Sequence, residues 1–147
     1  MSITDELYRE VILDHYKSPR NRGQLEQPDA AAQGNNPLCG DEIEVSLSLS
    51  GDTVTDITFQ GTGCSISQAS ASMLTEAIKG HSLQDVHAVV AAFKNMMMGD
   101  GTVDEDLLGD LEALQGVKKF PVRVKCATLA WNTLQEALDM YKNRRTP

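Results

Sequence analysis

The stretch EIEVSLSLSGDTVTDITF, residues 42–59, decides the fold of this chain. Apolar and polar residues alternate over 42–50, which is the pattern of a half-buried β-strand. A second stretch with apolar and β-branched residues covers 53–60. The turn sequence Ser50-Gly51-Asp52 joins the two. Together they predict an antiparallel hairpin.

The strand pattern ends at Gly61-Thr62-Gly63-Cys64, and the rest of the chain has helical periodicity. Apolar spacing, bounded by Gly and Pro, predicts helices over 3–16, 65–79, 82–98, 103–114 and 121–142. Residues 24–40 are rich in Gln, Ala, Asn and Pro and are predicted to be irregular. This order predicts an α+β fold, with a small antiparallel sheet near the N-terminal half and helices packed on one face.

Length and net charge limit the classes of function that this chain can have. The chain has 147 residues and 16.0 kDa, which suits a single domain spanning 1–147. A net charge of −8 disfavours nucleic-acid binding, which needs a basic face. No segment approaches the roughly 20 apolar residues of a membrane span. The polar start Met1–Glu6 lacks an export signal, so a cytoplasmic protein with reduced thiols is expected.

The three cysteines all lie where predicted elements begin or end. Cys39 precedes the first strand, Cys64 opens a helix after two glycines, and Cys126 lies in the first turns of the last helix. Amide groups at helix starts favour thiolates. With Asp41, these thiolates would make a four-coordinate site, and soft sulfur ligands select Zn²⁺ or an iron–sulfur cluster. The spacing contains no C-x-x-C, so three ordinary buried cysteines that never meet are an equally good interpretation.

Other residue groups carry less information. None of the histidines His15, His81 and His87 is adjacent to a cysteine, which disfavours a Cys–His hydrolase. Trp131 is predicted to anchor the core. Six basic residues form either a docking patch or scattered surface charge. They are Arg20, Arg22, Lys118, Lys119, Arg123 and Lys125.

Four separate segments resemble the signatures of the IscU/NifU-N/SufU family. They are Asp14-His15-Tyr16-Lys17-Ser18-Pro19-Arg20-Asn21-Arg22-Gly23, Asn36-Pro37-Leu38-Cys39-Gly40-Asp41, Gly61-Thr62-Gly63-Cys64-Ser65-Ile66-Ser67 and Pro121-Val122-Arg123-Val124-Lys125-Cys126. The resemblance covers nearly the whole chain in order. It implies a small α+β fold and a role in iron–sulfur cluster biogenesis. By motif position it implies a metal site at Cys39, Asp41, Cys64 and Cys126.

Two departures from the scaffold members of this family point to its SufU branch. Scaffold members carry His immediately before the last cysteine, where this chain has Lys125. The segment between Cys64 and Cys126 is also longer, with the excess expected within 95–117. The SufU resemblance implies a bound Zn²⁺ and transfer of persulfide sulfur from a PLP-dependent, SufS-like cysteine desulfurase to downstream cluster-assembly proteins.

Within that interpretation, Cys39 is the expected persulfide acceptor, because a loop cysteine is the easiest to move off the metal. Arg123 and Lys125 flank Cys126 in sequence and would offset the negative charge of a zinc site with three thiolates and a carboxylate. Two alternatives stay open. One is a scaffold on which a [2Fe–2S] cluster is assembled, and the other is a structural zinc domain without sulfur chemistry.

Overall fold

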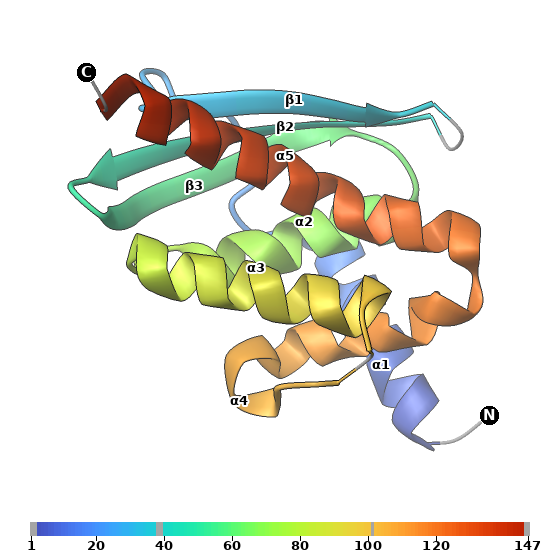
Figure 1. Cartoon of the computed structure of the whole chain (residues 1–147). Helices are drawn as coiled ribbons and strands as arrows, with labels where there is room; N and C mark the ends of the chain where they lie inside the picture. The colour runs from blue at the N-terminus through green and yellow to red at the C-terminus, as the bar shows by residue number, and fades with distance from the viewer. Residues whose placement is uncertain (1–2, 38–39, 101, 146–147) are drawn as a thin grey trace.

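The computed structural model describes residues 3–37, 40–100 and 102–145; for 3–8 and 144–145 it describes the backbone alone. The predicted α+β class is confirmed, and helices cover one side of a three-stranded sheet (Figure 1). The elements in chain order are α1 (Ile3–Lys17), β1 (Ala30–Asn36), β2 (Asp41–Ser50), β3 (Thr53–Thr62), α2 (Ser65–Ile78), α3 (Leu83–Met98), α4 (Glu105–Leu108), the 3-10 helix η1 (Gly109–Lys119) and α5 (Pro121–Arg145).

The predicted hairpin forms the centre and one edge of the sheet. The strands β2 and β3 pair antiparallel, with Val45 opposite Phe59 and Leu47 opposite Ile57. All four of these side chains are fully buried. The alternation in residues 42–50 therefore places one face of β2 in the core, as the period of two requires.

The prediction of irregular structure over 24–40 is wrong for residues 30–36, which form β1. This strand, AAAQGNN, lacks the β-branched and aromatic residues by which strands are recognised. It forms because its backbone pairs antiparallel with β2, from Ala30 opposite Leu47 to Asn36 opposite Asp41. Its small residues also let α5 lie against it, and Figure 1 shows α5 crossing the sheet beside β1.

The core lies between the sheet and the helices. The helices α5 and α2 contact the sheet, whereas α1 and η1 lie farther from it (Figure 1). Trp131 is fully buried, stacks on Phe93 with a centroid separation of 4.1 Å, and donates its indole N–H to Ser70 Oγ at 3.0 Å. The prediction that Trp131 anchors the core is confirmed. No helix among the described residues is long and apolar enough to cross a membrane.

The acidic helix predicted over 103–114 is only partly correct. A single α-helical turn, α4, is followed at Gly109 by the longer 3-10 helix η1. The large buried side chains recur every third residue, at Leu108, Leu111, Leu114 and Val117. A 3-10 helix has three residues per turn, so this spacing places all four on one face.

A substitution at Gly34 would test the close approach of β1 and α5. A Cβ at Gly34 would lie 2.3 Å from Thr133 Oγ1 and 3.3 Å from Leu129 Cδ1. We expect Gly34→Ala to lower the free energy of unfolding by about 1–3 kcal/mol, because overpacking forces the helix away from the strand. Urea unfolding measures this change. The control is Gly116→Ala, whose added methyl meets nothing within 4 Å. Equal stability of Gly34→Ala and the wild type would contradict this packing.

His15 joins α1 to α2 as a buried histidine. Its Nδ1 lies 2.8 Å from Ser72 Oγ and its Nε2 lies 3.4 Å from Glu76 Oε1. Ser72 Oγ also accepts the backbone N–H of Arg20. Burial, aided by the positive charge of Arg20, lowers the pKa of His15 against the opposing effect of Glu76.

This lowered pKa predicts a pH dependence of stability. The unfolded chain takes up a proton at the ordinary histidine pKa of about 6.5, while folded His15 does so only at lower pH. Neutral His15 therefore contributes its full stabilisation above about pH 6.5. This contribution declines as the pH falls, and it is lost below the pKa of His15 in the folded protein. We expect His15→Gln to flatten this decline when urea unfolding is measured at a series of pH values. Matching pH profiles for wild type and His15→Gln would contradict the assignment.

Candidate metal centre

The structure brings together one carboxylate and two thiols that lie far apart in the sequence. Ligand atoms of Asp41, Cys64 and Cys126 all lie within 4.8 Å of one another. Three elements deliver them: β2 begins at Asp41, Cys64 is the N-cap of α2, and Cys126 lies in the second turn of α5. Cys39, the fourth predicted residue, lies outside the described residues. Cys64 and Cys126 do meet, so the interpretation of cysteines that stay apart does not hold for this pair.

Asp41 is held by the backbone of α2. It is fully buried, and its Oδ1 accepts the Cys64 N–H at 2.8 Å. This bond satisfies one of the free amide groups at the helix start. Its other oxygen, Oδ2, faces Cys64 Sγ at 4.0 Å. A cation would further stabilise a buried carboxylate beside a thiol, because it offsets charge that has lost its hydration.

Gly63 makes room for this arrangement. Its φ is +154°, and a Cβ there would lie 2.3 Å from Asp41 Oδ1 and 2.7 Å from Ser67 Oγ. Ser67 Oγ in turn donates to the Cys64 carbonyl at 3.0 Å. Only glycine lets the chain pass this close to the carboxylate. The glycine before Cys64 therefore shapes the site.

Cys126 is fixed from two sides. Its side chain is fully buried, and Sγ lies 3.8 Å from the Val122 carbonyl and 3.9 Å from Asn36 Nδ2. Ser70 Oγ of α2 donates to the Ala127 carbonyl at 2.6 Å. Because α2 begins at Cys64, this bond ties the helix of one thiol to the helix of the other.

The donor set fits Zn²⁺. Tetrahedral zinc with sulfur and oxygen ligands places neighbouring ligand atoms roughly 3.5–3.8 Å apart. The three ligand atoms here lie within 4.8 Å of one another, so small side-chain movements would bring them to that spacing. Thiolate donors favour Zn²⁺ or iron–sulfur clusters over Mg²⁺ and Ca²⁺. Among the described residues, the cluster contains no histidine. His15 is bonded to Ser72, and His81 and His87 are exposed.

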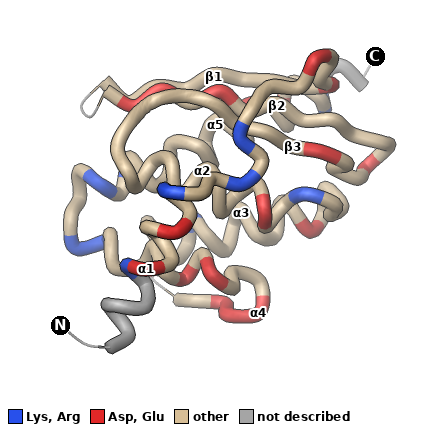
Figure 2. Tube along the Cα trace, turned by 180° about the vertical axis from the view of Figure 1, so that it is seen from behind, with Lys and Arg blue, Asp and Glu red and all other residues tan. Residues whose placement is uncertain are grey.

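Lys and Arg lie on several separate segments of the chain (Figure 2), and Arg22 lines a different pocket from Lys119 and Arg123. Arg20 pairs with Asp14 at 2.6 Å, and Arg22 lines a polar hollow beside the sheet. A different, largely apolar groove is bordered by Arg9, Lys119 and Arg123. Lys125 is exposed at the start of α5.

This apolar groove adjoins the metal centre. Ser65 and Ile66, which follow Cys64, form part of its wall. Phe120 and Val122 also line it and are 61% and 56% exposed. Exposed large apolar side chains beside a site are typical of a protein-binding surface.

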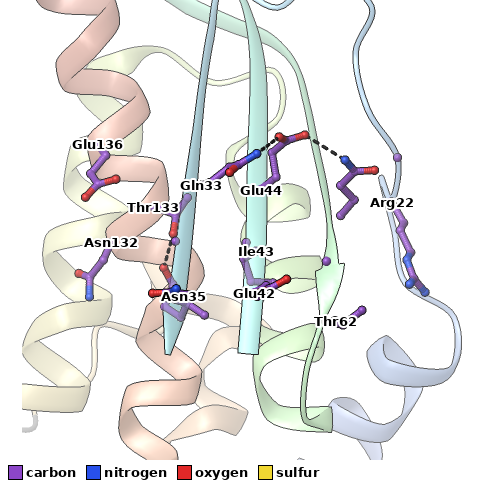
Figure 3. Close-up of a pocket in the computed structure, with 15 residues that line it drawn as sticks. Arg22, Gln33, Asn35, Glu42, Ile43, Glu44, Thr62, Asn132, Thr133 and Glu136 are labelled. Atoms are coloured by element: carbon purple, nitrogen blue, oxygen red, sulfur yellow. Dashed lines mark hydrogen bonds between the residues drawn. The ribbon is translucent and has the colours of Figure 1, made fainter. Parts of the chain in front are cut away.

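The polar hollow lies across the strand ends and the neighbouring side of α5 (Figure 3). Glu44 accepts hydrogen bonds there from Gln33 at 2.8 Å and from Gln60 at 3.0 Å. Asn35 and Glu42, one residue away from Asn36 and Asp41, also line this hollow (Figure 3). Neighbouring residues of a strand point to opposite faces, so Asn35 and Glu42 serve as controls for the buried pair.

Asn36 lies near the thiols, although no sequence pattern predicts a role for it. It belongs to the segment 36–41, but it contacts Cys126, which lies 90 residues further along the chain. Only the pairing of β1, which was not predicted, shows its position.

Residues 7–127 match the model of the NifU-like N terminal domain family. The chain is 52% identical over 134 residues to the zinc-dependent sulfurtransferase SufU of Bacillus subtilis, covering 91% of this chain and 90% of that protein. It is 43% identical to the iron-sulfur cluster assembly scaffold protein IscU of Streptococcus pyogenes, covering 97% and 89%.

A solved structure agrees with these relatives. The fold is similar to the crystal structure of FiSufU from Fervidobacterium islandicum AW-1, with a TM-score of 0.83, 38% identity and coverage of 88% of this chain and 94% of that one. The family match covers most of the chain and includes Asp41, Cys64 and Cys126. The chain therefore belongs to the NifU-like N terminal domain family.

Proposed function

We propose that this protein is a zinc-bound sulfur-transfer protein of iron–sulfur cluster biogenesis. It accepts persulfide sulfur from a PLP-dependent cysteine desulfurase and passes it to downstream cluster-assembly proteins. The observation that carries this proposal is the cluster of Asp41, Cys64 and Cys126, which contains no histidine among the described residues. Its similarity to the zinc-dependent sulfurtransferase SufU of B. subtilis supports the same function.

In this proposal Cys39, Asp41, Cys64 and Cys126 hold the metal. Bound Zn²⁺ keeps the thiols deprotonated near neutral pH. The Cys64 N–H orients Asp41, so that one carboxylate oxygen stays available as a ligand. Arg123 and Lys125, both exposed on α5 close to Cys126 in sequence, offset part of the negative charge.

The transfer step needs no net oxidant. The Cys39 thiolate attacks the outer sulfur of the desulfurase persulfide, and a new S–S bond forms on Cys39. The S–S bond of the desulfurase breaks, and its cysteine leaves as a thiolate. Cys126 is poorly suited to this role, because it is fully buried in a helix.

The apolar groove offers the desulfurase a surface next to the site. Phe120 and Val122 provide exposed apolar area, and Arg9, Lys119 and Arg123 border the groove with positive charge. In a chain of net charge −8, this local basic border suits an acidic partner surface.

The scaffold function is the second candidate, because the chain is 43% identical to the S. pyogenes scaffold protein IscU. Lys125 disfavours it, since the family resemblance implies His at this position in scaffold members. We further propose that 1–147 is one domain with a SufU-type insertion within 95–117, a range that includes α4 and most of η1.

Metal analysis separates zinc binding from cluster assembly. We expect the protein, purified without air or tag, to hold about one zinc per chain, no acid-labile sulfide and no visible colour. We expect Asp41→Asn and Cys64→Ser to lose zinc to a chelator that leaves wild type loaded, because each removes an anionic ligand. Glu42→Gln is the control, because Glu42 is exposed beside Asp41. Equal iron and sulfide with visible charge-transfer bands would favour the scaffold function.

A desulfurase assay tests sulfur transfer itself. We expect wild type to accelerate sulfide or alanine formation by a SufS-type desulfurase, and Cys39→Ala to abolish this stimulation, because the acceptor thiol is gone. Mass spectrometry without reductant would find the added sulfur on the Cys39 peptide of the wild type.

A groove variant supplies the control for this assay. Phe120→Ser keeps every thiol, so we expect it to raise the concentration needed for half-maximal stimulation while zinc content stays unchanged. Stimulation that survives in correctly folded Cys39→Ala would show that another cysteine is the acceptor. A zinc-loaded wild type that never stimulates any desulfurase would favour a structural zinc domain.

A further inference from the structure

Asn36 occupies a position that links the sheet to the buried thiol. It is the last residue of β1, and its Cα partner across the sheet is Asp41, the first residue of β2. Asn36 is 7% exposed, and its Nδ2 donates to Cys126 Sγ at 3.9 Å. One pair of strand residues therefore places a carboxylate at Cys64 and an amide donor at Cys126.

We propose that Asn36 is a positioning residue of the metal centre, which donates an N–H···S hydrogen bond to the Cys126 thiolate and keeps that thiolate on the metal. This inference rests on the proposed zinc function. An amide is suited to the role because its NH₂ group donates without carrying charge. A hydrogen bond to an anion in a buried site is stronger than one between neutral groups.

The strand pairing makes this donor rigid. Asn36 cannot shift along β1 without breaking the register with Asp41, and that register places the carboxylate at the start of α2. Cys126 in turn belongs to a helix that Ser70 bonds to α2. The donor is thus linked to α2 through Asp41 of the neighbouring strand, and its thiol is linked to α2 through Ser70.

The hydrogen bond also distinguishes the cysteines chemically. Donation from Asn36 draws charge from the Cys126 sulfur, which weakens it as a nucleophile. Cys64 is only half-buried, and its Sγ lies 4.0 Å from the Asp41 carboxylate, an acceptor. Cys126 is consequently the ligand that stays, and sulfur is accepted elsewhere in the site.

The test replaces the donor while keeping its size. Asn36→Leu removes the N–H, and Asn35→Leu makes the same change on the next residue, which is exposed in the hollow of Figure 3. We expect Asn36→Leu to bind zinc about 10- to 100-fold more weakly in chelator competition, the usual effect of losing a hydrogen bond to a metal ligand. Asn35→Leu should match wild type.

Cobalt substitution supplies a readout that a merely structural role would not change. In the Co²⁺-loaded protein, loss of the N–H···S bond leaves the sulfur richer in charge, so the sulfur-to-cobalt charge-transfer band should move to lower energy in Asn36→Leu. Thermal unfolding of the metal-free proteins measures any general loss of packing separately. If Asn36→Leu does not fold, Asn36→Ala takes its place with the same expected shift.

Two results separate this inference from the proposed function. Wild type that holds neither zinc nor cobalt would overturn the proposed function and the inference with it. Wild type that binds zinc, beside an Asn36→Leu protein with unchanged zinc affinity and an unchanged cobalt band, would overturn the inference alone. A lowered unfolding temperature without a band shift would likewise assign Asn36 a packing role and overturn the inference.

Discussion

The hydrogen bond from the Cys64 N–H to the Asp41 carboxylate joins the start of β2 to the start of α2. The site depends on it, because it orients a buried anion and caps a helix at the same time. It requires the close approach of Gly63, where any side chain would collide with Asp41. A carboxylate buried this completely beside two sulfur atoms is a reason for a cation to bind.

The second constraint is the contact between α2 and α5. Ser70 donates to the Ala127 carbonyl and accepts from Trp131, while Trp131 stacks on Phe93 of α3. These bonds lie in the core, away from solvent, where a polar contact left unpaired is costly. The tryptophan therefore contributes to function through position, because it fixes the helix of Cys126 relative to the helix that begins at Cys64.

Sequence patterns predicted the hairpin, the main helices and the chemical type of the site, because alternation, helical spacing and cysteines near glycines are local features. They missed β1, since the segment AAAQGNN has no strand character and pairs only because β2 lies beside it. They also misjudged residues 109–119. A three-residue apolar spacing there, from Leu111 to Leu114 to Val117, suits a 3-10 helix packed on the core rather than an acidic α-helix.

By itself the sequence determined the fold class and the candidate metal residues Cys39, Asp41, Cys64 and Cys126, because motifs are read from neighbouring residues. The tertiary structure decided that Asp41, Cys64 and Cys126 meet, that Arg22 and Arg123 line different pockets, and that Asn36 contacts Cys126. These facts depend on strand register and helix packing, which bring together residues up to 90 positions apart. No local sequence pattern contains that information, because the contacts form only when the chain folds.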